Sequence, residues 1–354
     1  MKNSRKNLFG SNIEIADEKV LSESGTGRKR EFNERKLQES KNVEKITIDS
    51  ALADVHVVSA KESEIDVRFS GKAQVDGDVR FSVKFVKNEL KIAVEVDGKC
   101  CISSLKLDIV MPQTSFKEID ICGGFGDVCV ENEGIITQKL DIKTSSGKID
   151  IRRGSCVKRI ALKTVSGSVY VDNTHGTEQM TIETSSGKVT VGKFVWSRTI
   201  DIQAVTGNVN MVGLGAEVIH VRSSTGKIEM AEGFFARKLN LETEIGNIVL
   251  EDGASEELNI NTSSGKITSK ISFANSIVNS GTGNVKIHIN AEQDIKVKIS
   301  TNIGNVAAVF ANIRHMKLST KSICGKVKNW HIDSLFGYRA SVDISTVTGN
   351  IEIK

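Results

Sequence analysis

Apolar and polar residues alternate with a period of two along most of the chain from Val43 onward, as in half-buried β-strands. From about Ile119 the alternating runs are imperfect copies of one stretch, Leu140–Ile151, and each copy turns at a glycine. These glycines recur 18 to 24 residues apart, a spacing that indicates a solenoid or array. They are Gly126, Gly147, Gly167, Gly187, Gly207, Gly226, Gly246, Gly265, Gly283, Gly304, Gly325 and Gly349.

Four columns of apolar residues accompany these corner glycines. The residue seven positions before the glycine is apolar in eleven of the twelve copies, and the residue two positions after it is always Val or Ile. The positions five before and four after are mostly apolar. The apolar residues occupy odd-numbered positions before the glycine and even-numbered positions after it, so the chain must turn a corner there. A glycine at this corner is expected to adopt positive φ. A recurrent Thr or Ser three positions before the glycine is expected to bond the corner backbone.

The columns distinguish two β architectures. A hairpin meander also has Gly-containing loops, but it gives no reason for the same side chain every 20 residues. A parallel stack, with each copy directly over the last, does. We therefore predict an all-β fold, a single-stranded parallel β-solenoid (β-helix) of about twelve rungs of ~20 residues, over residues 119–354.

The segments before the repeats are less regular. Residues 43–118 contain short alternating runs and are expected to form an N-terminal β cap, because an open sheet edge invites aggregation. Residues 1–42 are polar and charge-mixed, which predicts a flexible charged tail with a short helix over Glu31–Glu39. The triplet Arg28–Arg30 is flanked by acidic residues, so we expect it to be solvated.

Composition narrows the possible partners and sites. A net charge of +4 over 354 residues favours anionic partners weakly and is no nucleic-acid signature. No Cys-x-x-Cys pair occurs, and the six histidines share no column, so we expect no metal site and no cofactor. The adjacent Cys100 and Cys101 are expected to be free thiols. No signal peptide or membrane-spanning run is present, which predicts a cytoplasmic protein, with peripheral membrane or surface association still open.

Two outward columns carry charge. Asp120 and Asp141 stand six positions before successive glycines and are expected to be neighbours, either as an acidic pair of a polysaccharide-active β-helix enzyme or as an exposed cluster screened by nearby lysines. Directly after the glycines, lysine mostly alternates with a neutral residue. This column predicts either a solvated corner or a basic ridge that docks on an anionic polymer or lipid surface. The ridge lysines are Lys148, Lys188, Lys227, Lys266 and Lys326.

One glycine-rich segment is similar to a metal-binding repeat. Gly123-Gly-Phe-Gly-Asp127 resembles one calcium-binding Gly-Gly-x-Gly-x-Asp unit. It occurs once and lacks a spacer residue, whereas such sites need tandem copies to supply enough oxygens. We expect these glycines to form the first corner instead.

The repeats also resemble a known family. Thr144–Ile151, Thr164–Val171 and Ala204–Met211 are similar to repeats of the bacterial putative-adhesin family of unknown function, and Leu52–Val58 and Ile109–Pro112 are similar to its N-terminal segment. The resemblance spans residues 43–354. It implies a β-solenoid, sometimes encoded beside envelope-stress regulators, with no established activity and no catalytic residues.

These observations favour a non-enzymatic solenoid that presents an interaction or scaffold surface. Its partner would be a protein or the anionic surface of the cell envelope. Sequence-specific nucleic-acid binding is not expected. The alternative hypothesis is the polysaccharide-active enzyme, which would need an acidic strip within a groove.

Overall fold

The computed structural model describes residues 28–131, 136–153, 157–332 and 335–354. The chain divides into two compact units, Met1–Thr177 (unit 1) and Glu178–Lys354 (unit 2), which are described separately. Among the described residues, regular structure consists of β-strands. None of them forms a helix with the length and apolar character that a membrane span requires.

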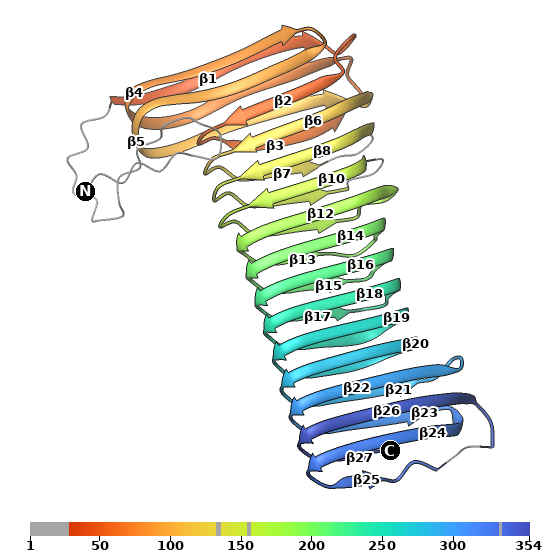
Figure 1. Cartoon of the computed structure of the whole chain (residues 1–354). Coiled ribbons are helices and arrows are strands. Elements are labelled where there is room, and N and C mark those ends of the chain that lie inside the picture. Colours follow the sequence, from red (N-terminus) through yellow and green to blue (C-terminus); the bar gives the residue numbers. More distant parts are fainter. Residues whose placement is uncertain (1–27, 132–135, 154–156, 333–334) are drawn as a thin grey trace. The chain divides into compact units, whose positions relative to one another are not determined.

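Unit 1 combines a long antiparallel region with parallel rungs (Figure 1). Strand β4 pairs antiparallel with both β1 and β5, and the remaining pairs of the unit are parallel. Its strands are β1 (Arg28–Glu39), β2 (Lys45–Ser50), β3 (Asp54–Ala60), β4 (Glu64–Val86), β5 (Glu89–Pro112), β6 (Ser115–Gly123), β7 (Val128–Glu131), β8 (Ile136–Thr144), β9 (Ile149–Arg152), β10 (Val157–Thr164) and β11 (Val169–Asp172).

The N-terminal strand was not predicted correctly from the sequence. Arg28–Glu39 form β1, so the helix expected over Glu31–Glu39 is wrong, and this part of the expected tail is an ordered edge strand. The ring of Phe32 lies tilted against that of Phe69 of β4, with 5.3 Å between ring centroids. A strand with a single inward aromatic residue shows no alternation of apolar and polar residues, so the sequence pattern did not predict it. The rest of the expected tail, residues 1–27, lies outside the described residues.

Unit 2 is a stack of parallel rungs (Figure 1). Its strands are β12 (Thr177–Ser186), β13 (Val189–Val191), β14 (Val195–Thr206), β15 (Val209–Val212), β16 (Leu214–Thr225), β17 (Ile228–Ala231), β18 (Phe234–Ile245), β19 (Ile248–Ser264), β20 (Ile267–Thr282), β21 (Val285–Asn290), β22 (Ile295–Ile303), β23 (Val306–Ala311), β24 (Ile313–Cys324), β25 (Val327–Asn329), β26 (Tyr338–Thr348) and β27 (Ile351–Ile353). The predicted parallel β-solenoid is thereby confirmed.

The order of rungs differs from a simple sequential stack near the chain ends. In unit 2, β26 pairs with β22 on one side and with β24 on the other, and β27 lies likewise between β23 and β25. The last rung in sequence is therefore inserted before the penultimate one. In unit 1, β2 lies between β5 and β6 in the same manner. The repeat contains no signal for this exchange, because every rung offers the same backbone pairing.

The predicted columns form the core. Around Gly207, Ile200, Ile202, Val209 and Met211 are fully buried. Burial of a side chain of this size contributes about 1.5–3 kcal/mol, so every rung adds a similar apolar increment. These columns explain why imperfect copies still stack in register.

The corner threonines behave as predicted. The Thr144 hydroxyl donates to the carbonyl oxygen of Gly147 at 2.9 Å, and the Thr164 hydroxyl accepts the N–H of Gly167 at 2.9 Å. Both side chains are buried. These bonds satisfy backbone groups that the corner removes from the strand pairing.

The reason for glycine at the corner is mostly close approach rather than positive φ. A Cβ on Gly207 would lie 2.1 Å from the carbonyl oxygen of Gly187, and neither Gly207 nor Gly147 has a left-handed φ. Gly283 and Gly304 do adopt φ of +151° and +156°. The prediction of positive φ therefore holds only for part of the column. A side chain at the other corners would force adjacent rungs apart.

Candidate functional site

The rung at the open end of unit 2 differs from the others. We call the described residues 313–332 and 335–337, which include β24 and β25, the end rung. Among the described strands, β24 pairs only with β26 and β25 only with β27, so one edge of this rung faces no described strand. Val327, in a column that is buried elsewhere, is 43% exposed here. Such an edge is available for contact with a partner.

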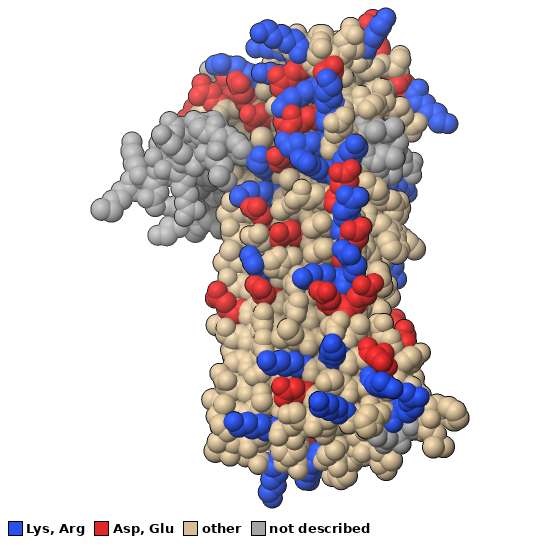
Figure 2. Space-filling view, turned by 45° about the vertical axis from the view of Figure 1, so that its right-hand side comes forward, with Lys and Arg blue, Asp and Glu red and all other residues tan. Residues whose placement is uncertain are grey.

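The end rung is strongly cationic. Residues 313–332 contain five Lys or Arg residues and no Asp or Glu. Asp333, the next acidic residue, lies outside the described residues. Figure 2 shows blue side chains projecting from the lower end of the molecule, where this rung lies in Figure 1. The cations are Arg314, Lys317, Lys321, Lys326 and Lys328.

Exposed apolar side chains lie within the same rung. Ile332, Leu335 and Phe336 are 86%, 88% and 82% exposed, and Ile323 is 64% exposed. Isolated surface apolar residues are common, but a cluster of large ones indicates an interaction surface.

Trp330 joins the apolar and cationic parts. Its side chain is half exposed, and the Nζ atoms of Lys328 and Lys354 lie 5.3 and 5.6 Å from its ring centroid. A lysine at this distance from an indole is attracted by the ring electrons. The end rung is therefore an amphipathic surface, with cations held beside an aromatic ring.

The predicted ridge lysines lie at equivalent corners within each unit, but they do not form an evenly spaced row. In unit 2, Lys266 and Lys326 are separated by the rungs of Asn284, Asn305 and Asn350, so they lie about four strand spacings, roughly 19 Å, apart. Insertion of β27 lengthens this gap from three strand spacings to four. Lys326 belongs to the end rung.

Two ridge lysines are paired with acids. Lys148 Nζ is 2.7 Å from Asp150 in unit 1, and Lys227 Nζ is 2.9 Å from Glu229 in unit 2. Their charges are neutralised locally. The ridge is thus a weaker candidate surface than the end rung.

The neutral residues of this column have a structural role that sequence reasoning missed. The Asn208 Oδ1 atom accepts the backbone N–H of Lys227 at 2.9 Å, and Asn247 accepts that of Lys266 at 2.8 Å. In unit 1, the Asp127 carboxylate accepts the N–H of Lys148. Asn and Asp therefore join successive rungs through their side chains. The observed alternation follows from backbone satisfaction as much as from charge spacing.

The segment Gly123–Asp127 serves the first corner. A Cβ at Gly124 or Gly126 would lie 2.2 Å from the backbone carbonyl oxygen of Ala51 or Ala53. The Asp127 carboxylate is used by the neighbouring rung, as described above. Each glycine thus has a packing explanation that requires no calcium.

Asp120 and Asp141 are neighbours within an ion-pair network. They are directly opposed on β6 and β8, as the spacing predicted. Lys45 Nζ lies 2.6 Å from Asp120, and Lys143 Nζ lies 3.0 Å from Asp141. Lys139 bridges the two carboxylates at 3.7 and 3.8 Å. Hydrogen bonds from Lys139 and Lys45 also lower the pKa of nearby Glu118. The network joins three strands of unit 1.

A shallow groove of about 560 Å³ crosses the outer surface of β19, β20, β22 and β26 in unit 2. Its acidic residues are Glu257 and Asp343, with Lys296 and Lys298 between them. The two acids lie three strand spacings apart and two residues offset along the strands, roughly 16 Å in all. Glycosidase carboxylates are about 5–9.5 Å apart. This groove therefore lacks the carboxylate spacing expected for the enzyme hypothesis.

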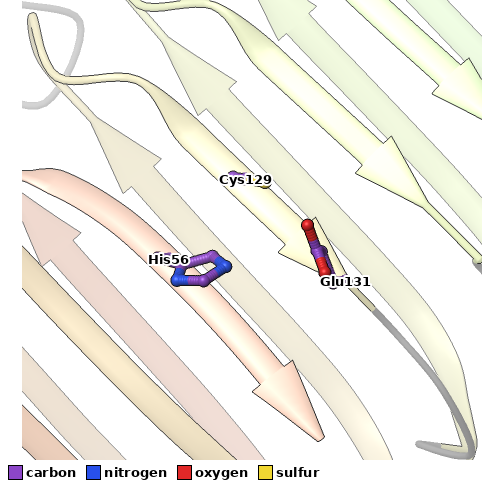
Figure 3. A group of neighbouring side chains, drawn as sticks. All are labelled: His56, Cys129 and Glu131. Atoms are coloured by element: carbon purple, nitrogen blue, oxygen red, sulfur yellow. The ribbon is translucent and has the colours of Figure 1, made fainter.

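A thiol, an imidazole and a carboxylate meet elsewhere, in unit 1. Candidate ligand atoms of His56, Cys129 and Glu131 all lie within 4.8 Å of one another (Figure 3). The expectation of no metal site rested on the six histidines sharing no column of the repeat. The register of the β3–β7 pair places His56 opposite Cys129. Cys122, Cys129 and Cys324 are free thiols, whereas the expectation for Cys100 and Cys101 concerns side chains outside the described part.

Comparisons with known proteins identify one family. The model of the family described as Toastrack DUF4097 matches residues 43–213 and 177–354. No curated protein is significantly similar in sequence.

Several bacterial proteins of solved structure are similar to this chain at low identity. A putative cell adhesion protein from Clostridium sporogenes has 10% identity, with 92% of this chain and 99% of that chain covered and a TM-score of 0.26. A putative adhesin from Parabacteroides merdae has 12% identity, 93% and 98% coverage and a TM-score of 0.29. A putative lipid binding protein from Parabacteroides distasonis has 12% identity, 92% and 98% coverage and a TM-score of 0.28. At these values, we infer function only from the residues of this chain.

Proposed function

The chain belongs to the Toastrack DUF4097 family, and we propose that it is a non-enzymatic interaction module that docks on an anionic lipid surface through the end rung. The observation that carries this proposal is the combination of five cations and no acid in residues 313–332 with large exposed apolar side chains in the same rung. Each property alone has many explanations. Together they match the two components of a lipid interface.

Both parts of the surface would contribute to binding. A Lys or Arg close to an anionic membrane contributes about 1 kcal/mol, which is reduced by salt. Apolar side chains enter the boundary between headgroups and acyl chains, and Trp is favoured at that level. Ile332, Leu335 and Phe336 provide the apolar contact, while Lys328 beside Trp330 provides charge at the same depth.

Charge argues against a second copy as the occupant. Two chains that meet through their end rungs would bring two sets of five cations together, without acids to neutralise them in residues 313–332. Like charges across an interface cost several kcal/mol. A protein strand that pairs with the β24 edge is the remaining competitor, and it would not need a bilayer.

Vesicle co-sedimentation tests the proposal. The protein should sediment with phosphatidylglycerol-containing vesicles at low salt, much less at high salt, and weakly with pure phosphatidylcholine vesicles. The triple variant Lys321→Gln, Lys326→Gln, Lys328→Gln should lose at least about tenfold in partition coefficient, since three charges near the surface are removed.

A matched control changes the same net charge elsewhere in unit 2. Lys188→Gln, Lys266→Gln, Lys286→Gln alters three exposed lysines outside the end rung and should change partition less than about twofold. Equal binding to neutral and anionic vesicles, no binding to either, or equal loss in both triple variants would reject the proposal.

A further inference from the structure

The side-chain group in unit 1 is formed by two adjacent parallel strands. His56 of β3 lies opposite Cys129 of β7, and Val58 lies opposite Glu131. Since side chains alternate along a strand, Cys129 and Glu131 point to the same face. Figure 3 shows the imidazole of His56 beside both, with one ring nitrogen turned toward Glu131. The three side chains are partly exposed, so a small ion can reach them from solvent.

The ligand chemistry of this group suits a borderline divalent cation. Thiolate, imidazole and carboxylate are the three kinds of ligand that bind Zn²⁺ in proteins, at about 2.0–2.3 Å. Ligand atoms around such an ion lie roughly 3.5 Å apart. The ligand atoms of His56, Cys129 and Glu131 lie within 4.8 Å of one another. Side-chain rotations that move these atoms by about 1 Å would bring them to the spacing of ligands around one ion. Three protein ligands leave a fourth position open.

A second, independent contact supports a ligand role for His56. Asp108 of β5 lies opposite His56 on the other side of β3, and its Oδ1 atom is 3.4 Å from His56 Nδ1. A carboxylate in this position holds the proton on Nδ1, which leaves Nε2 as the acceptor for a metal. Histidine ligands in proteins commonly have such a partner. Asp108 therefore positions the imidazole toward β7.

The neighbouring charges are compatible with a bound cation. Asp150 lies beside Cys129 on β9, but Lys148 and Arg152 both pair with it, so Asp108 and Glu131 are the carboxylates that act on the group. Arg152 lies 3.7 Å from Glu131 but is bonded through two nitrogens to Asp150, at 3.1 and 2.9 Å. The Asp150 contact holds the guanidinium when Glu131 turns toward the metal. Glu131 would give up only this long ion pair on binding a metal.

We propose that His56, Cys129 and Glu131 form a binding site for Zn²⁺, with Asp108 as the positioning residue and the fourth coordination position available to water or an exogenous ligand. The site lies on an open sheet face of unit 1. It is independent of the proposed lipid-binding surface, and neither requires the other.

Metal titration tests this site directly. The purified full chain should bind one Zn²⁺ in competition with a chromophoric chelator. Its Co²⁺ form should show a thiolate-to-metal charge-transfer band and the visible absorption of a tetrahedral ion. Cys129→Ser should abolish the charge-transfer band and weaken Zn²⁺ affinity at least about 100-fold. Cys122→Ser removes another half-buried thiol, on β6, and should leave both readouts unchanged.

The positioning role has its own test. Asp108→Asn should weaken Zn²⁺ affinity about 10- to 100-fold while keeping the Co²⁺ charge-transfer band, and Asp108→Glu should restore most of the affinity. Circular dichroism confirms that each variant keeps its β-structure. A charge-transfer band that persists in Cys129→Ser, or wild-type protein that binds no Zn²⁺ in excess over Cys129→Ser, would overturn the proposal.

Discussion

At the scale of single residues, the most unusual group in unit 1 is a buried carboxylate. The side chain of Asp66 on β4 is 1% exposed, yet it accepts hydrogen bonds from Arg35 at 2.9 and 3.0 Å and from Arg68 at 2.9 and 2.6 Å. The Arg35 bond is the largest cause of a lowered Asp66 pKa, and burial opposes it. Asp66 thereby attaches the edge strand β1, which carries Arg35, to β4.

Replacement of this carboxylate should destabilise unit 1. We expect Asp66→Asn to lower the free energy of unfolding by about 2 kcal/mol near pH 7, because the hydrogen bonds of two guanidinium groups lose their charged acceptor. A lowered pKa in the folded state means that the stabilisation is complete above the unfolded pKa of about 4 and is lost as pH falls through the folded pKa. In urea titrations, the difference in free energy of unfolding between wild type and variant should therefore narrow as the pH falls below about 4.

A control on the same strand separates this effect from general charge loss. Asp78 pairs with Arg30 of β1 but is 60% exposed, so Asp78→Asn should cost less than about 1 kcal/mol. Equal losses for the two variants, or a gap for Asp66→Asn that stays constant with pH, would show that the buried pair does not hold β1.

At the scale of strands, the end of unit 2 is distinguished by its order. The inserted strand β26 covers the edge of β22, and β24 becomes the outermost strand instead. Leu335 and Phe336 lie between β25 and β26 and are exposed. The exchange therefore both places a cationic strand at the open edge and adds exposed apolar residues to it.

Engineered disulfides distinguish the observed order from a sequential stack. Ser300, Lys321 and Ser345 occupy equivalent positions in their rungs, and Ser345 lies directly between the other two. The Ser300 and Ser345 hydroxyl oxygens are 3.4 Å apart. Because bonded cysteines have Cα atoms about 4.4–6.8 Å apart, Ser300→Cys with Ser345→Cys should crosslink. Ser300→Cys with Lys321→Cys should not, since two strand spacings separate them.

Peptide mapping without reductant measures the crosslinks. A sequential stack would give the reverse result, with the Ser300→Cys and Lys321→Cys pair bonded. That outcome would return β24 to the interior of the stack and remove the open edge from the end rung.

At the scale of the whole chain, the sequence predicts what every rung shares. Ile200, Ile202 and Val209 recur as columns because each copy has the same core contacts, so spacing alone identifies them. Features that depend on a contact made at only one place in the chain were not predicted. Strand β1 has a single inward aromatic residue. The order of β24 and β26 depends on which of these two strands pairs with β22, and both offer the same backbone groups.

The candidate sites follow the same division. Lys326 was identified because it belongs to a column, but the adjacent apolar residues from 330 to 336 lie outside the repeat and gave no periodic signal. The absence of acids over 313–332 is visible in the sequence and could have directed attention to this rung. His56 and Cys129 are 73 residues apart, since β4 and β5 intervene, and only strand pairing brings them together.

The central functional claim is that the end rung faces a lipid bilayer, and the two tryptophans allow a direct test. Trp330 lies in the end rung, whereas Trp196 is 54% exposed on β14, where nearby Lys193 is paired with Glu232 at 2.6 Å. With Trp196→Phe, only Trp330 fluoresces; with Trp330→Phe, only Trp196 does.

The decisive measurement is the fluorescence of these two variants with phosphatidylglycerol vesicles whose acyl chains carry bromine. We predict that Trp330 emission shifts to shorter wavelength and is quenched, because the indole enters the interface, while Trp196 emission stays unchanged. Quenching of Trp196 to the same extent, or unchanged Trp330 emission from protein that has bound the vesicles, would contradict a lipid-facing end rung.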